Sequence, residues 1–107
     1  MGRDSLGEFE QLVLLAALRL GSDAYVVPII DDIAARTGRD VTHAAVYVAL
    51  RRLEKRGLVS SRLGESTPER GGKPKRYFEV APEALSQLRE SRDALLSMWD
   101  GLEPAGR

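Results

Sequence analysis

Apolar positions in the first part of the chain repeat with the 3.6-residue period of an α-helix. The first set ends before Gly21, and the second starts near Pro28 and ends at Gly38, all residue types that fit helix boundaries. The spacing of Ser5 and Glu8 matches a capping box, so we expect the first helix to begin there. Its apolar positions are Leu6, Phe9, Leu12, Val13, Leu14, Leu15, Ala16, Ala17, Leu18 and Leu20. Because they cover more than one face, we expect this helix to be buried on two sides, the second against a partner subunit.

A third helix is predicted from Thr42, a residue type that caps helix N-termini, to the residues before Gly57. Val46, Leu50 and Leu53 follow at a spacing that places them on one face, which we expect to be buried. The other positions are small or polar near the start of the helix and cationic toward its end. The cationic side chains are Arg51, Arg52, Lys55 and Arg56. This helix therefore combines a buried face with an exposed, positively charged one.

A hairpin and a last helix complete the pattern. Residues 58–63 and 76–80 have β-strand character, and residues 64–75 between them are rich in glycine, proline, hydroxyl and charged side chains, which predicts a hairpin with a long tip. From Pro82 onward, large apolar residues recur at a 3-4 spacing. They are Leu85, Leu88, Leu95, Trp99 and Leu102, interrupted by Arg92. We expect this stripe to need a covering partner, because a short chain offers little further core.

The formal net charge is zero, but the charges are segregated along the chain. Residues 51–76 hold nine basic and three acidic side chains, whereas residues 1–50 and 77–107 are each net negative. A polyanion responds to the field within about a Debye length, roughly 8 Å in physiological salt, so the local excess matters more than the total. On charge alone, the basic segment is either a solvated loop or a surface for nucleic acid.

Composition excludes several classes of protein and of site. With 107 residues, the chain has the length of one domain. It has no cysteine and a single histidine, His43, so disulfides and cysteine nucleophiles are excluded and we expect neither a metal nor a cofactor. The sequence contains no run of about 18 apolar residues and no signal-peptide pattern after Met1, so we expect a cytoplasmic protein without a membrane partner.

The order of the predicted elements is that of a winged helix-turn-helix, a mainly α (α+β) fold with an N-terminal helix, a three-helix core, a two-stranded β-wing and one C-terminal dimerisation helix. We expect residues 5–81 to form a DNA-binding domain, residues 82–102 a dimerisation helix packed on the same core, and residues 103–107 a frayed tail. The DNA major groove is about 12 Å wide and accepts a helix that is small or polar at its start. The third helix meets this requirement, so double-stranded DNA is the expected partner.

Two longer motifs carry a resemblance to a known family. They are AVYVALRRLEKRGLV at residues 45–59 and GKPKRYFEV at residues 72–80. With these motifs the chain resembles the PadR family of bacterial transcriptional regulators over about residues 5–100, in the smaller branch that has a single C-terminal helix. The resemblance implies a homodimeric winged-helix repressor that binds a palindromic operator.

The resemblance also implies roles for individual residues. The positions that match the family's DNA-binding surface are Thr42, His43, Ala44, Tyr47 and Arg51 on the recognition helix and Lys73, Lys75 and Arg76 on the wing. The positions expected in the dimer of the first and last helices are Phe9, Leu12, Leu85, Leu88, Leu95, Trp99 and Leu102. Two positions depart from the family: Ala45 replaces a common threonine and so lacks a hydroxyl for DNA, and Ala81 offers no cap to the last helix.

Plainer interpretations stay open for several of these residues. His43 and Tyr47 could be exposed or half-buried side chains without a DNA contact. Trp99 could be dimer core or a platform for a ligand. The sequence also leaves open whether a small-molecule effector exists and whether regulation is repression or activation.

Two other functional classes are weaker alternatives. The Gly71-Gly72-Lys73 run lacks the rest of a phosphate-binding loop, because Thr67 and Pro74 stand where glycine and a hydroxyl residue are needed, so we expect no enzyme. A winged-helix module that binds only proteins is the runner-up. Such a module would carry acidic or large apolar residues on its third helix, whereas this helix is cationic.

Overall fold

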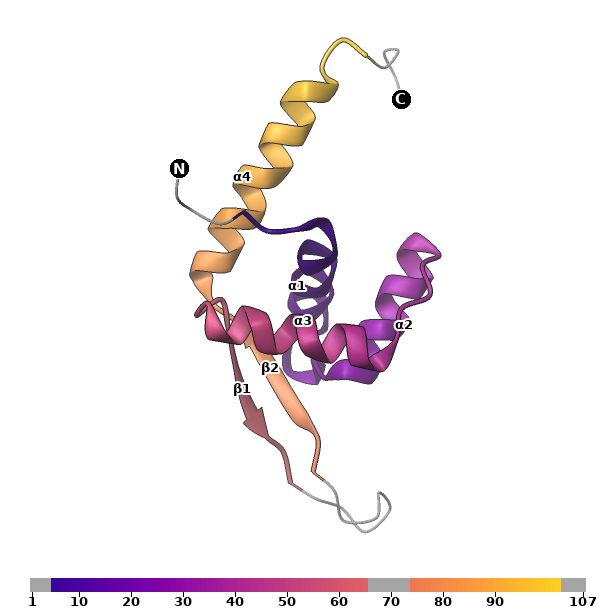
Figure 1. Cartoon of the computed structure of the whole chain (residues 1–107), viewed down its shortest axis with the longest axis vertical. Coiled ribbons are helices and arrows are strands. Elements are labelled where there is room, and N and C mark those ends of the chain that lie inside the picture. The colour runs from indigo at the N-terminus through magenta and orange to yellow at the C-terminus, as the bar shows by residue number, and fades with distance from the viewer. Residues whose placement is uncertain (1–4, 66–73, 103–107) are drawn as a thin grey trace.

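The computed structural model describes residues 5–65 and 74–102 of the chain. The elements in order are α1 (Glu8–Leu20), a 3₁₀ turn η1 (Gly21–Asp23), α2 (Val26–Thr37), α3 (His43–Lys55), β1 (Val59–Leu63), β2 (Arg76–Val80) and α4 (Pro82–Trp99). Figure 1 shows α1, α2 and α3 gathered at the centre, with the β1–β2 hairpin extending from one end and α4 from the other. This order confirms the winged helix-turn-helix predicted from the sequence. Most of the hairpin tip, with Lys73, and the tail at 103–107 lie outside the described residues.

One hydrophobic core joins the three central helices, the hairpin and the start of α4. On α3, Val46, Leu50 and Leu53 are fully buried, as the sequence predicted. The other large contributors are Val13 and Leu14 of α1, Ile29 and Ile33 of α2, Phe78 of β2 and Leu88 of α4. Because α3 and β2 are inserted in the same core, the positions of the recognition helix and the wing depend on the same packing.

The N-terminus of α1 differs from the predicted capping box. The helix begins at Glu8, with Gly7 as its N-cap in an extended conformation, and Glu10 Oε1 accepts the Gly7 N–H at 3.1 Å. The prediction that Ser5 caps this helix is therefore wrong. The reciprocal bond comes from Glu10 rather than Glu8, so the helix starts later than predicted, and Leu6, 8% exposed, packs in the core just before it.

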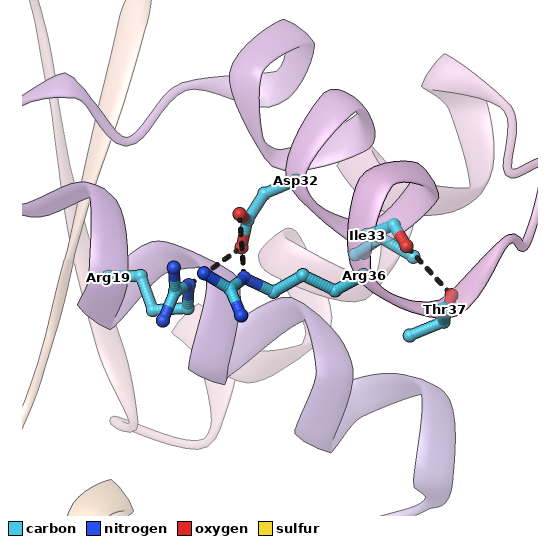
Figure 2. A network of polar contacts seen from close by, with 5 residues as sticks. All are labelled: Arg19, Asp32, Ile33, Arg36 and Thr37. Atoms are coloured by element: carbon cyan, nitrogen blue, oxygen red, sulfur yellow. Dashed lines mark hydrogen bonds and ion pairs between the residues drawn. The ribbon is translucent and has the colours of Figure 1, made fainter.

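A small polar network fixes α2 against α1 (Figure 2). One carboxylate oxygen of Asp32 in α2 forms an ion pair with Arg19 of α1 at 3.3 Å. The other forms an ion pair with Arg36 of the same helix, also at 3.3 Å. Thr37 Oγ1 donates to the carbonyl oxygen of Ile33 at 2.7 Å near the helix end. Exposed ion pairs contribute little free energy, about 0–1 kcal/mol each, so this network orients the two helices more than it stabilises them.

The hairpin attaches to the helical core at both of its strands. Its antiparallel register pairs Val59 with Val80 and Leu63 with Arg76. In addition, the Phe78 N–H donates to the carbonyl oxygen of Ala24 at 2.8 Å, so the segment between α1 and α2 bonds to the outer edge of β2. No local sequence pattern predicted this backbone hydrogen bond, which holds β2 of the wing against the helix-turn-helix.

Helix α4 packs on the core only at its start. Ala84 and Leu88 are buried, whereas Leu95, Trp99 and Leu102 are 58%, 53% and 71% exposed. Leu88, which was predicted to belong to the dimer stripe, therefore lies in the core of the single chain. The stripe divides at this point because the first turns of α4 cover the core and the later turns extend beyond it, as Figure 1 shows.

We expect Thr42→Ala to lower the free energy of unfolding by about 1 kcal/mol, because Thr42 Oγ1 accepts the Ala45 N–H at 3.0 Å and caps α3. Thr42→Ser keeps the capping oxygen and is the matched control. Urea denaturation followed by circular dichroism measures both variants. Equal losses for alanine and serine would contradict the capping role.

Candidate nucleic-acid interface

The start of α3 forms an exposed surface opposite its buried face. His43, Ala44 and Tyr47 are exposed, while Val46 and Leu50 on the inner side are fully buried. Thr42, the N-cap of α3, is also exposed and lies at the same end of the helix. The structure therefore brings together, on the exposed face of one helix start, the small and polar residues that were expected from the sequence to approach bases.

Arg51 lies along α3 and is held by two neighbours on the same helix. Its Nη1 donates to the Tyr47 hydroxyl at 3.5 Å, and its guanidinium carbon lies 5.8 Å from the centre of the Tyr47 ring. Its Nε is 3.5 Å from Glu54 Oε1. Arg51 is thus an oriented cation one turn beyond the exposed start of the helix.

Toward the tip end of the wing strands, two cations lie against two tyrosine rings. Lys75 Nζ donates to the Tyr25 hydroxyl at 3.1 Å and lies 4.2 Å from the centre of the same ring. The Tyr25 and Tyr77 rings meet edge to face at 5.3 Å, and Arg62 lies 4.9 Å above Tyr77. Arg62 was not among the residues predicted from the sequence. Its signal is the cross-strand pairing of Arg62 with Tyr77, which requires the register to be known.

Arg76 belongs to a different group, because side chains alternate across a strand. Its Nη1 donates to Ser61 Oγ at 2.9 Å, and the Ser61 hydroxyl donates to Glu54 Oε2 at 2.7 Å. This connects the wing to the last turns of α3. Lys75 and Arg76 therefore lie on the wing where its strands meet the tip, as their place in the sequence predicts, but each is held by side chains far away in the chain.

The four cations at the end of α3 do not form one surface. Arg56 Nη1 pairs with Glu10 Oε1 of α1 at 3.4 Å, and the two side chains are only 24% and 14% exposed. Arg52 lines an open groove between α1 and α3 with Phe9 and Val48. The prediction of a single cationic face is wrong for Arg56, whose role is to hold α1 and α3 together.

The described residues contain neither a metal cluster nor a membrane-spanning helix. Within residues 5–65 and 74–102 there is no cluster of three metal-binding side chains. No helix of the described part is both long enough and apolar enough to cross a membrane. A pocket of about 510 Å³ lies between the end of α1 and the hairpin, lined in part by Leu18, Ser22, Arg62 and Tyr77.

Comparisons with known proteins agree with this geometry. Residues 14–90 match the model of the transcriptional regulator PadR-like family. A PadR family regulator from Eggerthella lenta is 29% identical, with a TM-score of 0.69 over 89% of this chain and 82% of that chain. A PadR-like transcription factor from Bacteroides fragilis is 24% identical, with a TM-score of 0.70 over 88% and 85% of the two chains. The BpsR protein of Bordetella bronchiseptica is 20% identical, with a TM-score of 0.65 over 98% and 74%. No curated protein matches the sequence significantly.

Despite the net charge of zero, we expect binding to random-sequence duplex DNA to weaken linearly with the logarithm of salt concentration. Removing one cation that binds a phosphate should reduce that slope by about 0.9. The triple variant Arg62→Ala, Lys75→Ala and Arg76→Ala should therefore show a shallower slope in fluorescence anisotropy titrations.

Arg92→Ala is the control, because Arg92 pairs with Asp93 on α4, outside this surface. It should leave the salt slope unchanged. A triple variant with the slope of the unmodified protein would contradict the assignment of phosphate contacts to these three wing cations.

Proposed function

Since the chain belongs to the PadR-like family of transcriptional regulators, which are DNA-binding proteins and not enzymes, we propose that it is a repressor that binds a palindromic operator as a homodimer. The observation that carries the proposal is that α3, with its exposed start, and β2, with the oriented cations at its start, are inserted in one core. A module that binds only proteins has less support, because these cations suit a polyanion.

The proposed surface divides base recognition from phosphate binding. His43, Ala44 and Tyr47, with the capping residue Thr42, lie where a helix start approaches base edges. The phosphate contacts are assigned to the oriented cations of α3 and the wing. These are Arg51, Arg62, Lys75 and Arg76, together with Lys73, which is assigned from the sequence alone. Phosphate contacts position the protein, while base contacts specify the site.

The proposed dimer uses the part of α4 that leaves the core. Leu95, Leu96, Met98, Trp99 and Leu102 are between 53% and 76% exposed. Burying one such side chain contributes about 1.5–3 kcal/mol, so this surface favours a partner. We also assign to the interface the partly buried Phe9, Leu12 and Leu85 and the exposed Leu15 and Leu18 of α1, from their place in the sequence and their exposure. We accordingly assign residues 5–81 to DNA binding and 82–102 to dimerisation, with Leu88 supporting the helix from the core.

A small-molecule effector is a further part of the proposal. In BpsR of Bordetella bronchiseptica, 6-hydroxynicotinic acid regulates DNA binding. In this chain, the pocket between α1 and the hairpin is lined in part by Arg62 and Tyr77, which also form a cation–ring contact on the wing. A ligand bound there would change side chains that belong to the proposed DNA surface.

Selection of duplexes from a random pool tests the operator. We expect the recovered DNA to be palindromic, with half-sites about one or two helical turns apart. His43→Ala should change the recovered sequence, because base contacts carry specificity, whereas Arg51→Ala should recover the same sequence at lower affinity. Recovery of no preferred sequence, or of the same sequence at equal affinity by both variants, would contradict the proposal.

The double variant Leu95→Glu and Trp99→Ala should be a folded monomer that has lost operator binding, because both side chains are exposed in the single chain. Sedimentation equilibrium at micromolar concentration measures its mass, and circular dichroism its fold. Ser97→Glu adds the same charge on the opposite side of α4 and should stay dimeric. A monomeric unmodified protein that binds one half-site as tightly as the palindrome would refute the dimer.

A further inference from the structure

A continuous series of side-chain contacts runs from the groove-facing start of α3 to the second strand of the wing. Arg51 Nη1 donates to the Tyr47 hydroxyl at 3.5 Å, and Arg51 Nε lies 3.5 Å from Glu54 Oε1. Ser61 of β1 donates to Glu54 at 2.7 Å and accepts from Arg76 of β2 at 2.9 Å. The two proposed phosphate-binding arginines, one on each element, are thus connected through one carboxylate and one hydroxyl.

Glu54 is the residue on which both halves of this series depend. Its side chain is 30% exposed, and each of its two oxygens faces a different element. Oε2 accepts the Ser61 hydroxyl, while Oε1 is buried, has no hydrogen-bond partner within the described residues and lies in ion-pair contact with Arg51. A buried carboxylate oxygen without a hydrogen bond costs free energy. The negative charge of Glu54 also lies beside the surface proposed to bind DNA, where it disfavours a polyanion. A function carried by its contacts would offset both costs.

We propose that Glu54 is a positioning residue that couples the recognition helix to the wing and thereby increases discrimination between operator and random DNA. The carboxylate holds Arg51 along α3 and, through Ser61, holds Arg76 against the hairpin. Each arginine then reaches phosphates only from one direction. An unrestrained arginine reaches phosphates on any sequence, because phosphate contacts carry no sequence information.

This inference rests on the proposed function, and its first test needs no operator. Glu54→Gln keeps the size of the side chain and removes the charge. On random duplex DNA we expect the salt slope to steepen by about 0.9 for each arginine released, with affinity rising about threefold to tenfold near physiological salt. Glu79→Gln is the matched control: it removes one charge from β2, on an exposed residue with no ion pair among the described residues. It should leave the slope unchanged.

The second test measures the coupling itself on the selected operator. Arg51→Ala and Arg76→Ala should have non-additive effects on operator affinity in the unmodified background and additive effects in Glu54→Gln. The ratio of operator to random affinity should fall about tenfold in Glu54→Gln and stay constant in Glu79→Gln. Additive effects in the unmodified background would overturn the proposal.

A third readout requires no DNA. Residual dipolar couplings of the backbone amides give the orientation of the β1–β2 hairpin relative to α3, which should change in Glu54→Gln and not in Glu79→Gln. Unchanged orientation, or equal changes in slope for the two variants, would overturn the proposal. If Glu54→Gln does not fold, Ser61→Ala removes the hydroxyl between Glu54 and Arg76 and should change slope and hairpin orientation in the same directions. Failure to select any operator would contradict the proposed function. The salt slope on random DNA and the hairpin orientation would still test the positioning role of Glu54, because neither measurement needs an operator.

Discussion

The burial of one face of α3 is the constraint on which the rest of the structure depends. Val46, Leu50 and Leu53 are fully buried in the helical core. The opposite face of α3 is therefore exposed to solvent. Phe78 enters the same core from β2, which ties the wing to that direction. Interiors pack too tightly for one element to rotate independently of its neighbours. The recognition helix and the wing are therefore presented as one unit, from which α4 extends on the opposite side.

Electrostatics at this surface depends on orientation rather than on the amount of charge. The chain has equal numbers of acidic and basic residues. The wing cations nevertheless lie on tyrosine rings or against a hydroxyl group. In our proposal, Glu54 of α3 orients two arginines, Arg51 and Arg76. Each of these contacts is worth little in stability, because the groups are partly exposed. Their effect is to reduce the conformational freedom that DNA binding would otherwise have to remove. A neutral protein can in this way present a local, preorganised polycationic surface.

The sequence predicted what depends on local periodicity and failed where contacts are distant in the chain. The buried triplet of α3, its Thr42 cap and both strands follow from spacing and residue type. The contacts between Lys75 and Tyr25 and between Arg56 and Glu10 join residues 50 and 46 positions apart, so no local pattern reports them. Leu88 shows the same limit, since only the fold distinguishes a core leucine from an interface leucine on one stripe.

We propose that one rigid surface, made of the start of α3 and the wing residues Arg62, Lys75 and Arg76, meets DNA. A titration of the isotopically labelled protein with a duplex, followed by the backbone amide resonances, tests it most directly. We expect the largest shifts at His43, Ala44 and Tyr47 and at Arg62, Lys75 and Arg76, appearing together at one stoichiometry. Shifts confined to the exposed turns of α4, or to the groove between α1 and α3 around Val48, would contradict it.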